Sequence, residues 1–307
     1  MTDGALREAA RERVQALLGA EVRGVELMSG GPDHAVLAVR LDREPWRVLA
    51  KAYGPAVDGG HLTRTARLSA LARDAGAPVP AVLATETAVP SGAWRFLVQE
   101  HVEGVPWRQV RGRLAAPELR AAHRALADAL LAVQSVRFDA FGQVDAGAAL
   151  GPARGDLLTA LHHRVARRVA GAARRDLGHE VLDREADLFA GADRPVLCHD
   201  DLHDANVLFA PTRGRDGTGW RLAGLVDWDK AWAGPAEQDV ARMAFWDGMT
   251  GPGFWEVYRA AVPPAAGADR RAAVHQLLWC LEYDDPSPRH RTDTAALCRR
   301  LGVPPAP

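Results

Sequence analysis

The stretch "PVLCHDDLHDANVLF" at residues 195–209 concentrates ionisable side chains that could do chemistry. It holds three carboxylates and two histidines between two apolar runs, a pattern that predicts a strand, a loop and a second strand. Asp200 and Asp201 are adjacent, so on any regular element their side chains diverge and cannot share one role. The spacing to other polar residues decides which of the two can act.

That spacing selects Asp201, which lies five positions before Asn206, whereas Asp200 lies six before it. With His199 and Leu202 these residues form the pattern H-x-D-L-x-x-x-N of kinase catalytic loops. In that chemistry a carboxylate accepts a hydrogen bond from the attacking hydroxyl, and an amide oxygen reaches a magnesium ion that bridges the phosphates. Asp227 follows an apolar strand in "GLVDWD" and offers the second hard oxygen ligand that Mg²⁺ prefers.

The same loop could instead be a metal site or a solvated acidic loop. His199 and His203 could form an i, i+4 metal pair, but this requires a helix, and the flanking "PVL" and "VLF" favour strands without a third soft ligand nearby. A solvated acidic loop does not explain why Asn206 and Asp227 lie where phosphoryl transfer needs them. Phosphoryl transfer is therefore the favoured interpretation.

The elements around the loop divide into a β-rich and a helical half. A helix is expected at 4–20, and the rest of the first hundred residues follows the pattern β-β-β-α-β-β, with elements at about 22–28, 35–41, 46–53, 61–75, 81–86 and 93–102. Helical periodicity dominates afterwards, at about 116–137, 155–174, 178–190, 237–248, 253–262, 269–283 and 292–301. The segment "PTRGRDGTG" before the strand at 221–228 is expected to be a polar loop.

This order predicts an α+β fold with two lobes. Residues 1–102 form an N-terminal nucleotide-binding lobe, a five-stranded antiparallel sheet plus helices. Residues 103–307 form a larger, mostly helical lobe that carries the catalytic loop and the acceptor site, and a hinge lies near 100–106.

Residues 195–240 resemble the aminoglycoside phosphotransferase family, antibiotic and small-molecule kinases with a protein-kinase-like fold. The family pattern is H-G-D-L-H-x-x-N, then a strand ending I-D-W and a G-D-P-x-x-D-L-A segment. Here these segments are "HDDLHDAN" and "VDWDKAWAGPAEQDVA". The resemblance implies that Asp201 is the catalytic base, that Asn206 and Asp227 hold Mg²⁺, and that His199 and Asp239 organise the loop.

The resemblance extends to the nucleotide half. A flap over the triphosphate is expected at the turn after the first strand, and the third strand carries Lys51, the counterpart of the lysine that contacts the α- and β-phosphates. Of 38 basic residues only Lys51 and Lys230 are lysine, and the rest are arginine. This bias favours the interpretation that Lys51 has a role that arginine would not fill. The remaining residues implied to bind ATP or GTP are Ser29, Gly30 and Gly31 in the flap and Gln99, Glu100, His101 and Val102 in the hinge.

Three departures from the family pattern are visible. Asp200 replaces the glycine before the base, so that its charge acts beside the base or its side chain faces solvent. The helix after Lys51 lacks the glutamate that usually pairs with this lysine. The G-D-P segment lacks its aspartate, for which Glu237 or Asp229 could compensate. The missing glutamate means that Lys51 either finds another partner or has a weakened role, which keeps open a catalytically impaired nucleotide-binding protein.

Composition limits the partners and the compartment. A net charge of −1 gives no global field for nucleic acid or an anionic membrane. The N-terminus lacks a signal-peptide core, and no apolar run is long enough to span a membrane. Three cysteines without CxxC spacing favour a reducing compartment rather than disulfides or zinc. We therefore expect a cytoplasmic protein.

The acceptor is expected to be a small hydroxylated molecule, most of all an aminoglycoside-like or other cationic antibiotic that phosphorylation would inactivate. Carboxylates in the helical lobe are the candidates for binding it, namely Asp204, Glu282, Asp284 and Asp285. The alternative is a metabolic or biosynthetic small-molecule kinase of the same fold.

Overall fold

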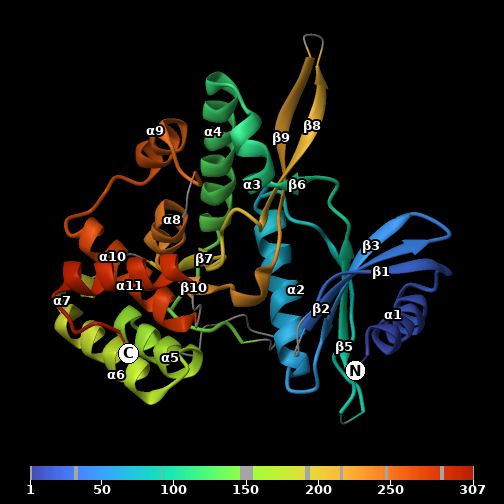
Figure 1. Cartoon of the computed structure of the whole chain (residues 1–307), viewed down its shortest axis with the longest axis horizontal. Helices are drawn as coiled ribbons and strands as arrows, with labels where there is room; N and C mark the ends of the chain where they lie inside the picture. Colours follow the sequence, from blue (N-terminus) through green and yellow to red (C-terminus); the bar gives the residue numbers. More distant parts are fainter. Residues whose placement is uncertain are drawn as a thin grey trace.

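The computed structural model describes residues 2–30, 34–90, 92–145, 155–190, 194–214, 217–245, 248–283 and 287–306. The chain forms two lobes, a sheet-rich one at the N-terminus and a helical one at the C-terminus (Figure 1). None of the described helices is long and apolar enough to cross a membrane.

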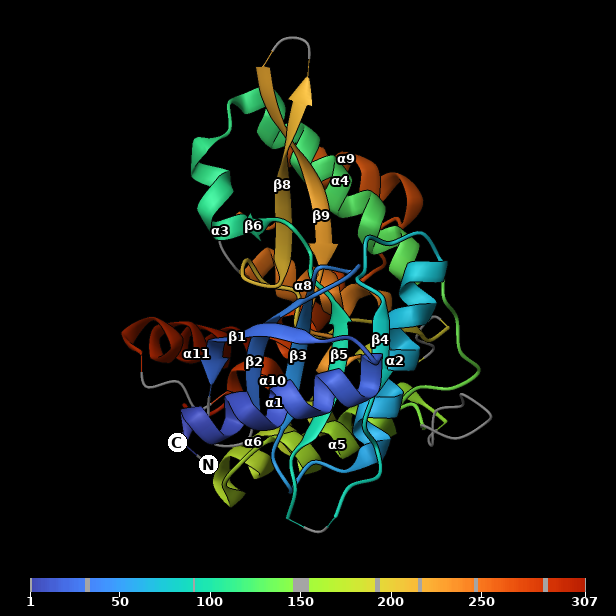
Figure 2. The same ribbon diagram turned by 90° about the vertical axis from the view of Figure 1, so that its right-hand side faces the viewer.

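The first lobe is built on a five-stranded antiparallel sheet in the order β1-β2-β3-β5-β4, as the sequence predicted. Its strands are β1 (Val22–Gly30), β2 (His34–Leu41), β3 (Arg47–Tyr53), β4 (Val82–Thr85) and β5 (Arg95–Glu100). Two helices accompany it, α1 (Asp3–Leu18) and α2 (Gly59–Asp74). Helix α1 lies along the outer face of the sheet, and α2 lies beside β4 (Figure 2).

Alternation along β3 explains why Lys51 faces the cleft. Val48, Ala50 and Ala52 are fully buried and pack in one core with Leu6 and Val14 of α1. Because successive side chains of a strand point to opposite faces, Lys51 projects from the other face, toward the second lobe. Its side chain reaches residues of that lobe.

The second lobe begins with β6 (Val105–Pro106), α3 (Trp107–Val110) and η1 (Arg111–Arg113), which lead into the long helix α4 (Ala116–Gln134). Three helices follow, α5 (Leu157–Arg168), α6 (Ala172–Arg184) and α7 (Ala186–Phe189). The chain then forms β7 (Val196–Cys198), β8 (Val207–Gly214), β9 (Gly217–Leu225), η2 (Trp228–Lys230) and β10 (Trp232–Gly234). Four helices complete it, α8 (Ala236–Phe245), α9 (Pro252–Ala261), α10 (Ala268–Glu282) and α11 (Pro288–Leu301).

Two sequence-based boundaries were wrong. The helix predicted at 155–174 is divided between α5 and α6, because the backbone becomes extended at Val169, and Gly171, which precedes α6, has a φ of +80° that suits glycine. The segment predicted as a polar loop at 211–219 extends β8 and β9 into a long hairpin, with Pro211 paired to Trp220 and Thr212 to Gly219. The residue types of this segment are typical of turns and therefore predicted a loop, whereas its strand structure comes from the pairing between β8 and β9.

Candidate active site

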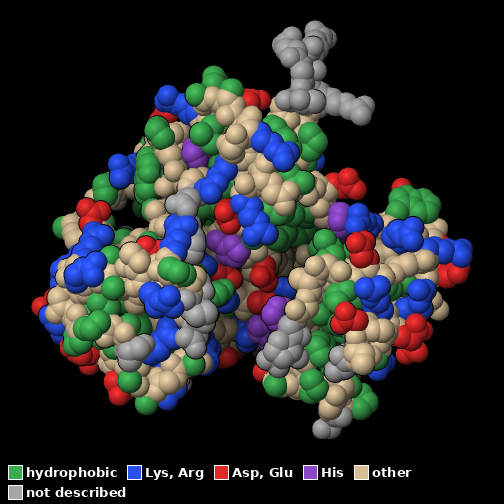
Figure 3. Space-filling view, viewed as in Figure 1, with side chains coloured by type: hydrophobic (Ala, Val, Ile, Leu, Met, Phe, Trp, Pro, Cys, Tyr) green, Lys and Arg blue, Asp and Glu red, His purple; other side chains and the backbone are tan. Residues whose placement is uncertain are grey.

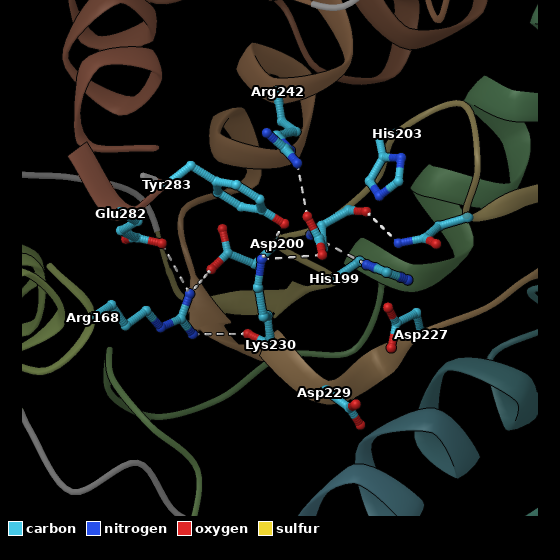
Figure 4. A network of polar contacts seen from close by, with 12 residues as sticks. Arg168, His199, Asp200, His203, Asp227, Asp229, Lys230, Arg242, Glu282 and Tyr283 are labelled. Atoms are coloured by element: carbon cyan, nitrogen blue, oxygen red, sulfur yellow. Dashed lines mark hydrogen bonds and ion pairs between the residues drawn. The ribbon is translucent and has the colours of Figure 1, made fainter. Parts of the chain in front are cut away.

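The two lobes meet at a hollow in which acidic, basic and histidine side chains gather (Figure 3). Beneath it, β7 and β8 flank the loop 199–206, and the turn after β9 lies beside that loop (Figure 4). The main-chain N–H of Val226 donates to the carbonyl of Asn206 at 2.9 Å, which fastens the turn to the loop. Segments from both ends of the β8–β9 hairpin are thus held together.

His199 and Asp239 hold the shape of the loop. Nε2 of His199 lies 3.0 Å from the carbonyl of Val226, and Nδ1 accepts the N–H of Asp201 at 3.3 Å, so the proton is on Nε2. Burial lowers the pKa of His199, in keeping with this neutral ring. Asp239, in the first turn of α8, accepts the main-chain N–H groups of His199 at 2.8 Å and Asp200 at 2.7 Å.

Asp200 is buried, with a side chain that is only 4% exposed, and its backbone adopts a φ of +65°. Glycine is the residue best suited to that conformation, which gives a physical reason for the glycine in the family pattern. The carboxylate binds Arg164 at 2.8 Å, Arg168 at 2.5 Å and the amide of Gln238 at 2.5 Å. Burial raises the pKa of Asp200, but Arg164 and Arg168 outweigh it, so the pKa is lowered. The expectation of a solvent-facing side chain was wrong, because two arginines of α5 compensate the buried charge.

Asp201, the predicted base, is held by two cations. Arg242 of α8 binds Oδ1 at 2.7 Å, and Nζ of Lys230 lies 3.1 Å from Oδ2. The amide of Asn206 donates to the Asp201 carbonyl at 3.0 Å. Burial raises the pKa of Asp201, but Lys230 and Arg242 more than offset it, and the pKa is lowered. The carboxylate is therefore ionised at neutral pH and can accept a hydrogen bond from a hydroxyl.

The predicted magnesium ligands come from the loop and from the turn, and the main-chain bond from Val226, the residue before Asp227, to Asn206 brings the two segments together. The Asn206 amide nitrogen donates to the Asp201 carbonyl, which leaves its oxygen as the atom that could bind a metal. Asp227 has a left-handed φ of +73° and a side chain that is 41% exposed. An amide oxygen and an accessible carboxylate are ligands that suit Mg²⁺. The donor set therefore fits the ion that the family pattern implies.

Lys51 finds its partners in the second lobe. Its Nζ contacts Asp227 Oδ1 at 2.5 Å and Asp229 Oδ2 at 2.7 Å. Asp229 also accepts the hydroxyls of Tyr53 at 2.8 Å and Thr65 at 3.4 Å. Burial lowers the pKa of Lys51, but Asp229, Tyr53 and Asp227 outweigh it and the pKa is raised. The sequence indicated no partner for this lysine, although the "VDWD" spacing placed a second carboxylate two residues after Asp227.

The other predicted nucleotide residues lie at the ends of strands. Ser29 and Gly30 end β1, Gln99 and Glu100 end β5, and His101 and Val102 follow in the connection to β6. Gly31 lies outside the described residues. Glu100 exchanges hydrogen bonds with Ala81 beside β4, its side chain accepting the Ala81 N–H at 2.9 Å. The connection between the lobes therefore starts from a fixed strand end.

The predicted acceptor carboxylates do not share one environment. Asp204 is half-buried beside His203. The side chain of Glu282 is 5% exposed, and its carboxylate binds Arg164 and Arg168. Asp284 and Asp285 lie outside the described residues. The described side chains next to the base are instead cationic, Lys230 and Arg242.

A two-lobed fold with a lysine on the third strand, an aspartate in the catalytic loop and an Asn/Asp pair for a metal defines the kinase-like class of phosphotransferases. The model of the phosphotransferase enzyme family matches residues 25–273. The chain belongs to this family, and it is a phosphotransferase that acts on a hydroxyl or similar acceptor. The resemblance inferred from the motifs and the two-lobed α+β fold are both confirmed.

Solved structures share the fold at low sequence identity. A candidate fructosamine-3-kinase from Haemophilus somnus is 15% identical, with a TM-score of 0.66 over 95% of this chain and 96% of that one. The ADP-bound aminoglycoside phosphotransferase APH(2″)-Ib is 16% identical, with a TM-score of 0.58 over 98% and 100%. The GDP complex of aminoglycoside 2′-phosphotransferase-IIIa is 12% identical, with a TM-score of 0.58 over 97% of each chain. No curated protein matches the sequence.

Proposed function

We propose that this protein transfers the γ-phosphate of ATP or GTP to a hydroxyl of a small molecule in the cytoplasm. The proposal rests mainly on one observation: Lys51, which is far from the others in the sequence, contacts Asp227, and the turn that carries Asp227 is hydrogen-bonded to the loop that carries Asp201 and Asn206. The ADP and GDP complexes among the similar structures support a nucleotide donor. The three cysteines are free and buried, which suits a reducing compartment.

Each lobe has its own part in this proposal. Residues 1–102 bind the nucleotide, with Lys51 on the α- and β-phosphates, Ser29 and Gly30 at the flap, and main-chain groups of 99–102 at the base. Residues 103–307 carry the catalytic loop and the acceptor site. Asn206 and Asp227 would hold Mg²⁺, which neutralises charge on the phosphates when it is bound.

Asp201 orients the acceptor. Its carboxylate accepts a hydrogen bond from the hydroxyl, aims the oxygen at the γ-phosphorus and receives the proton as transfer proceeds. Because the pKa of Asp201 is lowered, orientation and charge neutralisation supply more of the rate than basicity does. The intact set of contacts also makes a non-catalytic binding protein the weaker alternative.

The class of acceptor follows from the side chains near the base. An aminoglycoside-like antibiotic, the acceptor that the sequence favours, would be bound through Asp204, the described candidate carboxylate that is not paired with arginine. A metabolic acceptor is favoured by the cations that flank Asp201, which disfavour an ammonium group beside the reacting hydroxyl. A panel of antibiotics and of neutral and anionic hydroxylated metabolites separates the two.

The test is nucleotide consumption by the purified protein with Mg-ATP and Mg-GTP against that panel. Asp201→Asn should lower turnover by about 100-fold or more while nucleotide affinity stays unchanged. Asp187→Asn, at an exposed position of α7, is the matched control and should behave as wild type. Full turnover in Asp201→Asn would sink the assignment of the base. No binding of either Mg-nucleotide would sink the function itself.

A further inference from the structure

Lys230 is one of two lysines in a chain with 38 basic residues, and the proposed function gives a role only to the other. It ends the short helix η2, three residues after Asp227 and directly after Asp229. Its side chain points toward the catalytic loop and Tyr283, whereas that of Asp229 points away from the loop (Figure 4). One turn thus carries the metal ligand Asp227, the Lys51 partner Asp229 and a cation at the base.

The two cations on Asp201 are held differently. Arg242 is buried, with 6% of its side chain exposed, and its guanidinium lies 3.4 Å from the centre of the Trp279 ring. Lys230 has a side chain that is 31% exposed, with Nζ 3.1 Å from Asp201 Oδ2 and 3.1 Å from the Tyr283 hydroxyl. Arg242 therefore fixes one carboxylate oxygen, while the partly exposed Lys230 contacts the other.

The charge around the base favours an incoming anion. Two cations against one carboxylate give Asp201, Lys230 and Arg242 a net charge of +1. A hydroxyl bound to Oδ2 lies roughly 3 Å from that oxygen and roughly 3 Å from the phosphorus it attacks. An ammonium group 3.1 Å from Oδ2 is then within a small side-chain movement of the phosphoryl oxygens.

We propose that Lys230 is a catalytic residue that donates a hydrogen bond to the phosphoryl group during its transfer; this inference rests on the proposed function. The acceptor oxygen forms a bond to the γ-phosphorus as the bond from that phosphorus to the bridging oxygen breaks. The bonding pair leaves with the nucleoside diphosphate, and the hydroxyl proton passes to Asp201. Lys230 keeps its protons and stabilises the negative charge on the equatorial oxygens.

Lysine suits this position better than arginine. The ammonium is compact and has three N–H donors, which can serve Asp201, Tyr283 and a phosphoryl oxygen together. Burial lowers the pKa of Lys230, but Asp201 and Tyr283 outweigh it, and the pKa is raised. The side chain therefore stays protonated throughout the range in which the enzyme would work.

The proposal is tested by binding of a transition-state analogue, so that no acceptor is needed. The affinity of the full-length protein is measured for Mg-ADP alone and for Mg-ADP with aluminium fluoride, which mimics the transferred phosphoryl group. Wild type should bind the aluminium fluoride complex more tightly than ADP. Lys230→Met should lose about 100-fold of that added affinity, the scale seen when one donor to a developing charge is removed, and should bind ADP as wild type does.

Two further variants sharpen the outcome. Arg7→Met removes one positive charge at an exposed position of α1 and should leave both affinities unchanged. Lys230→Arg keeps the charge and should recover part of the added affinity. Slow ATP hydrolysis, with water as the acceptor, should fall in the same order as analogue binding.

The outcomes separate the two proposals. If wild type binds neither Mg-ADP nor Mg-GDP, or gains nothing from aluminium fluoride with either nucleotide, the proposed function fails and the role of Lys230 fails with it. If wild type gains affinity and a folded Lys230→Met gains as much, only the role of Lys230 is overturned. Equal losses of ADP and analogue binding in Lys230→Met would also overturn it, because they indicate a structural role.

Discussion

Replacing Asp200 with alanine and with glycine separates two effects that act at one residue. Both substitutions remove a buried carboxylate that binds Arg164, Arg168 and Gln238. Removing one partner of a buried ion pair costs about 3–5 kcal/mol. Arg164 keeps Glu282 as a partner, so we expect a loss of free energy of unfolding near the lower end, about 3 kcal/mol.

The backbone distinguishes the two variants. A φ of +65° costs an alanine roughly 1–2 kcal/mol, whereas glycine adopts it freely. Asp200→Gly should therefore be more stable than Asp200→Ala by about 1 kcal/mol, the reverse of their order in a helix or strand. Chemical denaturation followed by fluorescence gives both values from the shift in midpoint.

A double-mutant cycle with Arg168→Met assigns the ion-pair part, because Arg168 binds the Asp200 carboxylate directly at 2.5 Å. We expect a coupling of about 0.5–3 kcal/mol between the two positions. The reasoning fails if Asp200→Ala equals or exceeds Asp200→Gly in stability. It also fails if either variant is as stable as wild type, because the buried carboxylate would then contribute nothing.

Two more predictions concern the nucleotide site and pH. Asp229→Asn should weaken Mg-ADP binding by about tenfold, a loss of roughly 1.4 kcal/mol. The reason is that Lys51 keeps Asp227 but loses a charged partner that also binds the Tyr53 hydroxyl. Isothermal titration calorimetry measures the affinity, and an unchanged value would contradict the pairing of Lys51 with Asp229. The pKa of Asp201 is lower in the folded protein than in the unfolded chain, where it is about 4. Its ionisation therefore supports folding and activity above about pH 4, and this contribution is lost as the pH falls through the folded-state pKa. ATP hydrolysis should therefore be level through neutral pH, and its acid limb should move to higher pH in Lys230→Met; a wild-type acid limb centred near pH 6–7 would contradict an Asp201 held ionised.

The candidate site could be predicted from the sequence where spacing along the chain sets the geometry. Asp201, Asn206 and Asp227 were selected by intervals within one hairpin, because such intervals survive in the folded loop. The partner of Lys51 was not accessible, because Asp229 lies 178 residues away and only the meeting of the lobes brings them together. The role of Asp200 was hidden for the same reason, since its arginines lie on α5, 36 and 32 residues earlier. Local sequence patterns predict elements and motifs. The side chains that stabilise an unusual residue within a motif, as the arginines of α5 do for Asp200, come from distant parts of the chain.

Within the segment 227–230, three side chains contact three different parts of the candidate site. A left-handed residue at Asp227 starts the turn, so that consecutive side chains leave it in different directions. Asp227 contacts Lys51, Asp229 contacts Lys51 and Tyr53, and Lys230 contacts Asp201 and Tyr283. A shift of this turn would therefore alter the proposed metal site, the proposed nucleotide lysine and the proposed base together. The bond from Val226 to Asn206 and the packing of His199 against Trp228, with ring centres 4.6 Å apart, hold it against the catalytic loop. These contacts join the catalytic loop to this turn, and the ion pairs of Lys51 link the turn to the first lobe.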